Sequence, residues 1–434
     1  MHGAICTDFG KRSYRDLISK GVGFKLFRKA KHHPALDFLR YIGPGMIVAV
    51  GFIDPGNWAA NLAAGSQFGY KLLWVITFST IILVFLQHNA AHLGIVTGKC
   101  LSENATLHLN RYLSKFILIT AMLAAVSTAM AEILGAALAL QMLFKLPLQI
   151  GAVLSCALAI WLLFSNSYRK IEKVIMGFVS LIGISFLIEL FIAPVDWSTA
   201  SVSLFVPAMP AGSILVIMSI IGAVVMPHNL FLHSEVIQSR QWNIEDEATI
   251  RRQLKYEFTD TIFSMSVGWI INSAIVIIAA ALFFSRGSVV TEIDQAQDML
   301  KPLLGNAAAT LFALALLLAG IASSLTAGMA GGSIYAGIFR EPYDIRDSHS
   351  KIGVLITMIL AVIIIFFVSS PFNALIYSQM LLSVQLPVTI FFQIYLTSSK
   401  RVMGKYKNTG FTNTILILTG IFVTALNIML LATL

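Results

Sequence analysis

The chain has 434 residues, of which 57% are hydrophobic and only 12% are charged, a composition that excludes an ordinary soluble protein. A formal net charge of +9 would suggest nucleic-acid binding in a soluble protein. In a membrane protein, the accumulation of Lys and Arg in cytoplasmic segments explains the same excess. The three cysteines, Cys6, Cys100 and Cys156, show neither the spacing of a metal site nor a disulfide framework.

The first 40 residues are polar and basic, and they lack the apolar stretch of a secretory signal peptide. We therefore expect residues 1–40 to form a cytoplasmic tail. Its Lys and Arg residues are Lys11, Arg12, Arg15, Lys20, Lys25, Arg28, Lys29, Lys31 and Arg40.

Long apolar stretches follow, most of them near the length of about 20 residues that a helix needs to cross the hydrocarbon core. Strands that alternate apolar and polar residues, as an outer-membrane barrel requires, are absent from the sequence. The sequence therefore predicts eleven membrane-spanning helices. They cover residues 41–66, 70–96, 115–143, 148–167, 173–194, 212–238, 258–285, 303–338, 352–369, 371–398 and 411–433.

The distribution of Lys and Arg fixes the predicted orientation. With the N-terminus inside, the tail and the alternate loops on its side hold all but four of the 30 basic residues. The four exceptions are Lys71, Lys145, Arg286 and Lys301. Cytoplasmic loops are the ones enriched in Lys and Arg. We expect a multi-pass protein of the cell membrane, with a cytoplasmic N-terminus and an extracytoplasmic C-terminus.

Two apolar stretches are interrupted by similar tetrads. One reads Asp-Pro-Gly-Asn over residues 54–57, and the other reads Met-Pro-His-Asn over residues 226–229. Proline removes a backbone donor and obstructs the carbonyl group one turn earlier, so each tetrad breaks its helix. Broken helices at corresponding places in two halves of a chain mark a transporter binding site near the bilayer midplane.

The two breaks fall in the first and the sixth predicted helices. Five helices precede the sixth, and an odd number inverts the second set of five relative to the first. The sequence thus predicts an all-α membrane protein with a 5+5 inverted repeat of the LeuT type. The repeats cover about 41–194 and 212–398 within a transport core at 41–398, and residues 411–434 form an additional eleventh helix.

The residues at the breaks suit a transition metal. Asp54 would be costly inside a membrane unless it met a cation or a polar partner. Asn57 offers an amide oxygen, and the unwound backbone at Gly51 and Ala223 offers carbonyl oxygens. Met226 adds a thioether sulfur, a soft ligand that favours Mn²⁺ or Fe²⁺ over Mg²⁺ and Ca²⁺.

These motifs make the chain resemble the Nramp family, proton-coupled transporters of divalent transition metals with a LeuT-type fold. Both tetrads match motifs of that family, and the similarity runs from about residue 40 to the last predicted helix. Further matching segments are Gly43-Pro44-Gly45, Phe68-Gly69-Tyr70, Leu73-Trp74, Leu93 to Lys99, Ala131-Glu132, Ser378-Gln379 and Gln385-Leu386-Pro387.

The resemblance implies roles for particular residues. The metal ligands would be the side chains of Asp54, Asn57 and Met226 and the main-chain oxygens of Gly51 and Ala223. In the occluded state, Gln379 would join them. The proton route would include Asp54, Glu132, His228 and His233. Histidine is also the side chain best suited to load and release protons near neutral pH.

The sequence departs from the family pattern on the proton route. Ala129 stands where the family has an aspartate, and residues 320–324 read Gly-Ile-Ala-Ser-Ser instead of Gly-Gln-Ser-Ser-Thr. The basic start of the ninth predicted helix is reduced to Arg346 and Lys351. Because alanine cannot relay a proton, we expect coupling to be weakened or rerouted through Glu132 and His228.

His88 and His92 are spaced i, i+4 and therefore share a helix face. A zinc protease motif has this spacing with a glutamate after the first histidine, but Asn89 takes that place here. We expect a structurally satisfied or surface-facing pair. A secondary cytoplasmic metal contact is the alternative.

The sequence predicts a secondary transporter, not an enzyme, that imports Mn²⁺ or, next, Fe²⁺ by alternating access with H⁺ co-transport. Its partners would be these ions, protons and the lipid bilayer, with no cofactor, no nucleic acid and no required oligomer. Four alternatives stay open: an uncoupled uniporter, a Mg²⁺-transporting relative, a sodium-coupled amino-acid symporter and an intramembrane metalloenzyme.

Overall fold

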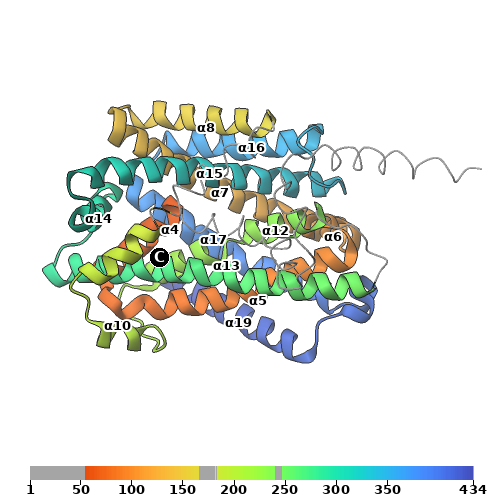
Figure 1. Ribbon diagram of the computed structural model, residues 1–434. Coiled ribbons are helices and arrows are strands. Elements are labelled where there is room, and N and C mark those ends of the chain that lie inside the picture. Colours follow the sequence, from red (N-terminus) through yellow and green to blue (C-terminus); the bar gives the residue numbers. More distant parts are fainter. Residues whose placement is uncertain (1–53, 166–180, 182, 240–246, 434) are drawn as a thin grey trace, which may run out of the picture. The chain divides into compact units, whose positions relative to one another are not determined.

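The computed structural model describes residues 54–165, 181, 183–239 and 247–433, all within the compact unit Ile42–Leu434. Every regular element of these residues is a helix (Figure 1). The predicted all-α class is therefore confirmed. The predicted tail at 1–40, the start of the first predicted helix and the proposed ligand Gly51 lie outside the described residues.

The helices of the N-terminal half include those of the predicted apolar stretches, and the short helices α6 and α10 lie in segments between them. They are α4 (Pro55–Phe68), η3 (Gly69–Leu72), α5 (Leu73–Thr97), α6 (Leu101–His108), α7 (Arg111–Phe144), α8 (Leu148–Phe164), the apolar helix Gly183–Ile192 and α10 (Trp197–Ser203).

The C-terminal half begins with the second break and ends with the last predicted stretch. Its helices are α11 (Ile214–Val225), α12 (Pro227–Ser239), α13 (Glu247–Leu282), η4 (Phe284–Arg286), η5 (Ile293–Ala296), α14 (Gln297–Leu304), η6 (Gly305–Ala307), α15 (Ala308–Ile338), α16 (Ser348–Ile365), α17 (Pro371–Ser398), α18 (Lys400–Met403), η7 (Gly404–Tyr406) and α19 (Gly410–Thr433).

Among the described residues, eight segments are long and apolar enough to cross a membrane. One of them, Pro55–Thr97, contains both α4 and α5, which the sequence predicts as two spans. Two further apolar helices, Leu148–Phe164 and Gly183–Ile192, are shorter. Each predicted apolar stretch therefore contains a helix, whereas the inverted repeat of five helices stays a prediction.

Two predicted boundaries are wrong for identifiable reasons. The stretch predicted to start at residue 258 starts at Glu247, because the first turns of α13 are polar and hydropathy does not detect them. The stretch predicted at 303–338 corresponds to α15, which begins later, at Ala308, because residues 303 and 304 are the end of the preceding helix α14. Gly305, with φ of 54°, ends α14 in a conformation that favours glycine.

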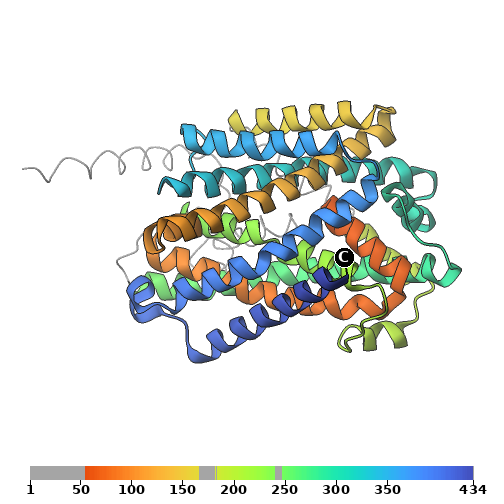
Figure 2. The same ribbon diagram turned by 180° about the vertical axis from the view of Figure 1, so that it is seen from behind.

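The helices of this unit pack in two groups (Figures 1 and 2). In one group, α7, α8, α15 and α16 lie side by side, and in the other α5 packs along α13. Helices α4 and α17 lie between the groups, since each contacts α7 and also α13 or α5. Helix α11 packs against both α4 and α17. The two breaks are therefore held between the groups.

Small residues allow the closest of these approaches, as is usual between membrane helices. A Cβ atom added to Gly320 of α15 would lie 2.7 Å from the Glu132 carbonyl oxygen and 2.8 Å from the Ala136 nitrogen of α7. Both of these are backbone atoms, which cannot rotate away. The contact between α15 and α7 therefore depends on a glycine at position 320.

We expect Gly320→Ala to lower the free energy of unfolding by about 1–3 kcal/mol, the usual cost of overpacking. The measurement is the melting temperature of the purified protein in detergent. Gly410→Ala is the matched control, because a Cβ atom there meets nothing within 4 Å. Equal melting temperatures for the two variants would contradict this account of the packing.

Candidate metal-binding site at the paired helix breaks

The second break is a single residue, Met226. Helix α11 ends at Val225 and α12 begins at Pro227, and between them Met226 adopts φ of 43° and ψ of 83°. This left-handed conformation is uncommon for a residue with a side chain, and such residues gather at functional sites. It redirects the chain so that α11 and α12 are separate helices.

Pro227 frees a carbonyl oxygen for the site. Because proline has no N–H, the carbonyl of Ala223, four residues earlier, receives no helical hydrogen bond. Asn57 Nδ2 donates to this oxygen at 3.1 Å. We predicted unwound backbone at Ala223, and this detail is wrong: Ala223 lies in the last turn of α11, and the proline alone exposes its oxygen.

At the first break, Asp54 caps the N-terminus of α4. Asp54 precedes α4, and its Oδ1 accepts a hydrogen bond from the Asn57 backbone N–H at 2.7 Å. The other carboxylate oxygen, Oδ2, accepts from Asn57 Nδ2 at 2.7 Å. Both side chains are fully buried. Asn57 therefore bonds to Asp54 on its own helix and to Ala223 across the site, which joins the two breaks directly.

Two buried amide oxygens at the site, Asn57 Oδ1 and Gln379 Oε1, have no hydrogen-bond partner among the residues that the structure describes. Two glycines leave the space that Gln379 occupies between their helices. A Cβ atom on Gly56 would overlap the Gln379 side chain, and one on Gly222 would overlap its main-chain carbonyl. Gln379 of α17 thus lies directly against α4 and α11. A buried oxygen without a donor is costly unless a cation or another donor binds it.

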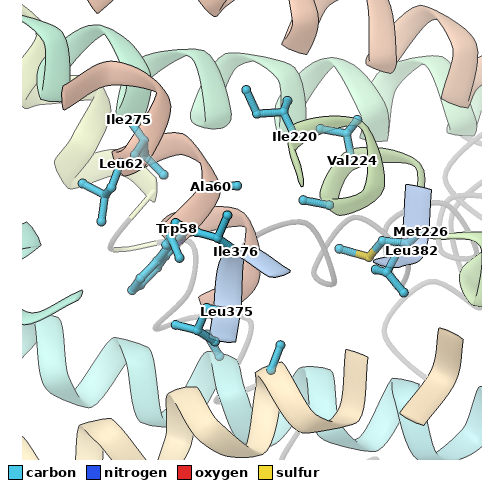
Figure 3. Packing of buried hydrophobic residues seen from close by; sticks show 14 of the residues in the cluster. Trp58, Ala60, Leu62, Ile220, Val224, Met226, Ile275, Leu375, Ile376 and Leu382 are labelled. Atoms are coloured by element: carbon cyan, nitrogen blue, oxygen red, sulfur yellow. The ribbon is translucent and has the colours of Figure 1, made fainter. Parts of the chain in front are cut away.

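The sulfur of Met226 is buried with the rest of the site, and the residue is 1% exposed. Its Sδ accepts a hydrogen bond from Asn229 Nδ2 at 3.0 Å, so the side chain is oriented by α12. Met226 belongs to the buried apolar cluster drawn in Figure 3, where Leu382 of α17 is the labelled residue nearest to it in the view and Trp58 and Ile376 lie farther away. Water is largely excluded from this region.

The arrangement is a mixed set of ligands rather than a strong metal cage. Among the described residues, no group of three His, Cys, Asp or Glu side chains is placed to hold a metal ion. One carboxylate, amide and carbonyl oxygens and one thioether sulfur bind more weakly than several charged ligands do. Such a set suits an ion that must be released from the site as well as bound by it.

The residues expected on the proton route occupy different environments. Glu132 of α7 is fully buried, and neither of its carboxyl oxygens has a hydrogen-bond partner. His228 Nδ1 lies 3.2 Å from Thr128 Oγ1, also on α7. His233, in contrast, points to α13, where its Nε2 lies 3.5 Å from Glu257 Oε1. The structure therefore brings His228 to α7 and separates His233 from it.

The departures from the family pattern are visible in the structure. Ala129 is fully buried on α7 and provides no titratable group. Ser323 and Ser324 of α15 are buried, and Ser324 bonds to the carbonyl of Gly320 at 2.6 Å. Lys351 is exposed at the start of α16. A carboxylate and its basic partner are thus both missing from these positions.

The sequence did not reveal Glu257. It lies one residue before the predicted stretch at 258–285, and its position outside that stretch made it look like part of a loop. The structure places it on a buried turn of α13, where Oε2 is 2.6 Å from His88 Nδ1. The predicted satisfied environment of His88 is confirmed, and His92 stacks on it with 6.0 Å between ring centroids.

Comparisons with known proteins identify the family of the chain. The family described as natural resistance-associated macrophage protein-like matches residues 45–433. The divalent metal cation transporter MntH of Caldanaerobacter subterraneus subsp. tengcongensis is 37% identical over 91% of this chain and 93% of its own length. The MntH protein of Granulibacter bethesdensis is 38% identical over 91% of this chain and 88% of its own.

Solved structures of similar fold include a transporter of the same kind as these relatives. The manganese transporter of Eremococcus coleocola superposes with a TM-score of 0.75 at 28% identity, covering 92% of this chain and 87% of that one. Mhp1, a nucleobase-cation-symport-1 transporter, has a TM-score of 0.59 at 17% identity over 86% and 82%. The likeness to Mhp1 concerns the fold alone and confirms the predicted LeuT-type class. Taken with the family match over residues 45–433, these findings show that the chain belongs to the Nramp family.

Proposed function

We propose that the chain imports divalent transition-metal ions, Mn²⁺ first and Fe²⁺ next, with H⁺ as the co-transported ion. One observation carries the proposal: the buried Asn57 side chain bonds both to the Asp54 carboxylate and to the Ala223 carbonyl, which has no helical donor. Relatives named as divalent metal cation transporters and as a manganese transporter support this cargo. These names also agree with the expectation that the chain is a transporter and not an enzyme.

Binding would proceed by exchange of hydrogen bonds for metal contacts. Asn57 Nδ2 donates to the Asp54 carboxylate and to the Ala223 carbonyl, the two groups that a cation would also bind. When a cation takes these oxygens, the amide must turn away and can present Oδ1, which has no partner. Gln379 Oε1 and Met226 Sδ would complete the set. The metal thus replaces contacts that hold the two breaks together.

The breaks also provide the moving parts of an alternating-access mechanism. Helices α4, α11 and α12 end or begin at the site, so they can rock against the other helices around a fixed binding position. An inside-negative potential supplies about 2.3 kcal/mol per elementary charge per 100 mV. A divalent cation gains twice that amount, so uptake can continue even when proton coupling is weak.

Proton co-transport rests on fewer groups than the family pattern provides. Ala129 cannot relay a proton, whereas Glu132 has two unpartnered carboxyl oxygens and His228 has only a long contact to Thr128. We propose that Glu132 and His228 take up the proton close to the metal site. An uncoupled uniporter is the second candidate, and the loss of the carboxylate at position 129 is the observation that favours it.

Asp54→Asn should reduce Mn²⁺ uptake at least about tenfold, because removing the charge forfeits at least about 1.5 kcal/mol of a charged contact. Asparagine still caps a helix, so α4 should remain intact. The measurement is quenching of a metal-sensitive dye inside liposomes under an imposed potential. Asp196→Asn, the same change at the exposed cap of α10, is the control and should retain uptake. Full uptake by Asp54→Asn would contradict the proposed site.

Met226→Leu keeps the volume of the side chain and removes the sulfur. We expect the excess of Ca²⁺ or Mg²⁺ needed to halve Mn²⁺ uptake to fall roughly tenfold, a change of about 1.4 kcal/mol in selectivity. Competition in the same liposomes measures it. Met218→Leu, a buried methionine of α11 away from the break, is the control. Unchanged competition in Met226→Leu would rule out selection by the sulfur.

A further inference from the structure

A polar cluster connects three helices away from the metal site. Glu257 of α13 accepts a hydrogen bond from Thr261 Oγ1 at 2.7 Å through Oε1 and lies 2.6 Å from His88 Nδ1 of α5 through Oε2. On the other side, His233 Nε2 of α12 is 3.5 Å from Oε1. The carboxyl group of Glu257 therefore lies between two imidazole rings that belong to different helices.

The cluster runs from the interior of the protein toward its surface. The side chain of His233 is 0% exposed, that of Glu257 is 5% exposed and that of His88 is 27% exposed. In the described part of the chain, the ion pairs of Glu257 are made with these two histidines and with no Lys or Arg. His92 is a further titratable group at this position, since its ring stacks on that of His88, and Asp260 is buried one turn along α13 from Glu257.

The cluster lies toward the predicted cytoplasmic ends of its helices. Glu257 follows Arg251, Arg252 and Lys255 by at most six residues, and this basic run is what assigns the start of α13 to the cytoplasm. His88 lies nine residues before the end of α5 at Thr97, which corresponds to about 13–14 Å along the helix. His88, the exposed end of the cluster, therefore lies in the predicted cytoplasmic half of α5.

We infer that His233, Glu257 and His88 form a proton relay that leads from α12 to the cytoplasmic side of the protein. The inference rests on the proposed function. It assigns roles to Glu257, which the sequence motifs did not identify, and to His88, which the sequence analysis expected to be structurally satisfied or surface-facing. His233 Nδ1 is buried without a hydrogen-bond partner, so this nitrogen can receive a proton from the interior.

The transfer conserves protons at every step. A proton arriving on His233 Nδ1 produces an imidazolium ion, which gives the proton on Nε2 to Glu257. The carboxyl group, now neutral, rotates and passes that proton to His88 Nδ1. His88 then releases the proton on its other nitrogen to water. One proton has entered and one has left, and the three groups again carry one negative charge in total. Both imidazole rings then hold their proton on Nδ1, so each must return to the Nε2 tautomer before the next proton is transferred.

The contact between His233 and Glu257 is the long step of the relay. At 3.5 Å it is at the limit of a hydrogen bond, whereas the contact between Glu257 and His88 is short. His233 belongs to α12, the helix that begins at the metal-site break. A small movement of α12 would therefore close or open the first link, so that proton release would follow the transport cycle.

A purely structural role for the cluster predicts different behaviour. If the three side chains only hold α5, α12 and α13 together, an isosteric amide at position 257 should lower stability and leave the ratio of protons to metal unchanged. Glu257→Gln retains the size of the side chain and one acceptor oxygen, replaces the other oxygen by an NH₂ donor, and cannot take up a proton. The ratio of the two fluxes therefore separates the two roles.

The experiment uses full-length protein in liposomes that contain a metal-quenched dye and a pH dye. Mn²⁺ is added outside under an inside-negative potential. We expect wild type to take up Mn²⁺ and acidify the interior. In Glu257→Gln and His88→Gln the proton flux per Mn²⁺ should fall at least fivefold while Mn²⁺ uptake persists. Glu341→Gln, which removes the carboxylate of a surface His–Glu pair with His349, is the control and should match wild type.

The outcomes distinguish the relay from the proposed function. An unchanged ratio in folded Glu257→Gln and His88→Gln overturns the relay and leaves metal transport intact. If Glu257→Gln does not fold, His88→Gln decides alone, since its side chain lies at the exposed end of the cluster. Mn²⁺ uptake by wild type without acidification also overturns the relay. Absence of Mn²⁺ uptake by wild type contradicts the proposed function and the relay together.

Discussion

A proline inside an apolar helix leaves the carbonyl group four residues earlier without its helical donor, and most features of this protein's centre follow from that fact. At Pro227 the freed oxygen belongs to Ala223, and Asn57 satisfies it from the other broken helix. Asn57 in turn is held by Asp54, the cap of α4. The contact between the two breaks is therefore a structural requirement and also the framework of the cation site that we propose.

The surrounding helices are arranged so that this contact can be buried. Gly56 and Gly222 let Gln379 approach from α17, and Gly320 brings α15 against the turn of α7 that carries Glu132. Because lipid offers no hydrogen-bond partners, each polar group here must find one in the protein or bind an ion. Among the described residues the amide oxygens of Asn57 and Gln379 have no partner, which agrees with the metal contacts that we propose for them.

The sequence predicted the helical class, the positions of the apolar stretches and the break residues, since hydropathy and proline act locally. The conformation of Ala223 was predicted wrongly. Its backbone stays helical, and its carbonyl oxygen lacks a helical donor only because Pro227 has no N–H. Glu257 was missed for a different reason: a single carboxylate at the edge of an apolar stretch looks like a loop residue. Only tertiary packing, which places His88 and His233 on either side of it, reveals its environment.

The central claim is that a transition-metal ion binds where the two breaks meet. Anomalous diffraction from crystals of the protein grown with Mn²⁺, recorded on both sides of the manganese absorption edge, tests it most directly. The account predicts one strong peak in contact with the Asp54 carboxylate, the Ala223 carbonyl and the Met226 sulfur. A peak elsewhere, for example between His88 and Glu257, with none at the breaks, would contradict it.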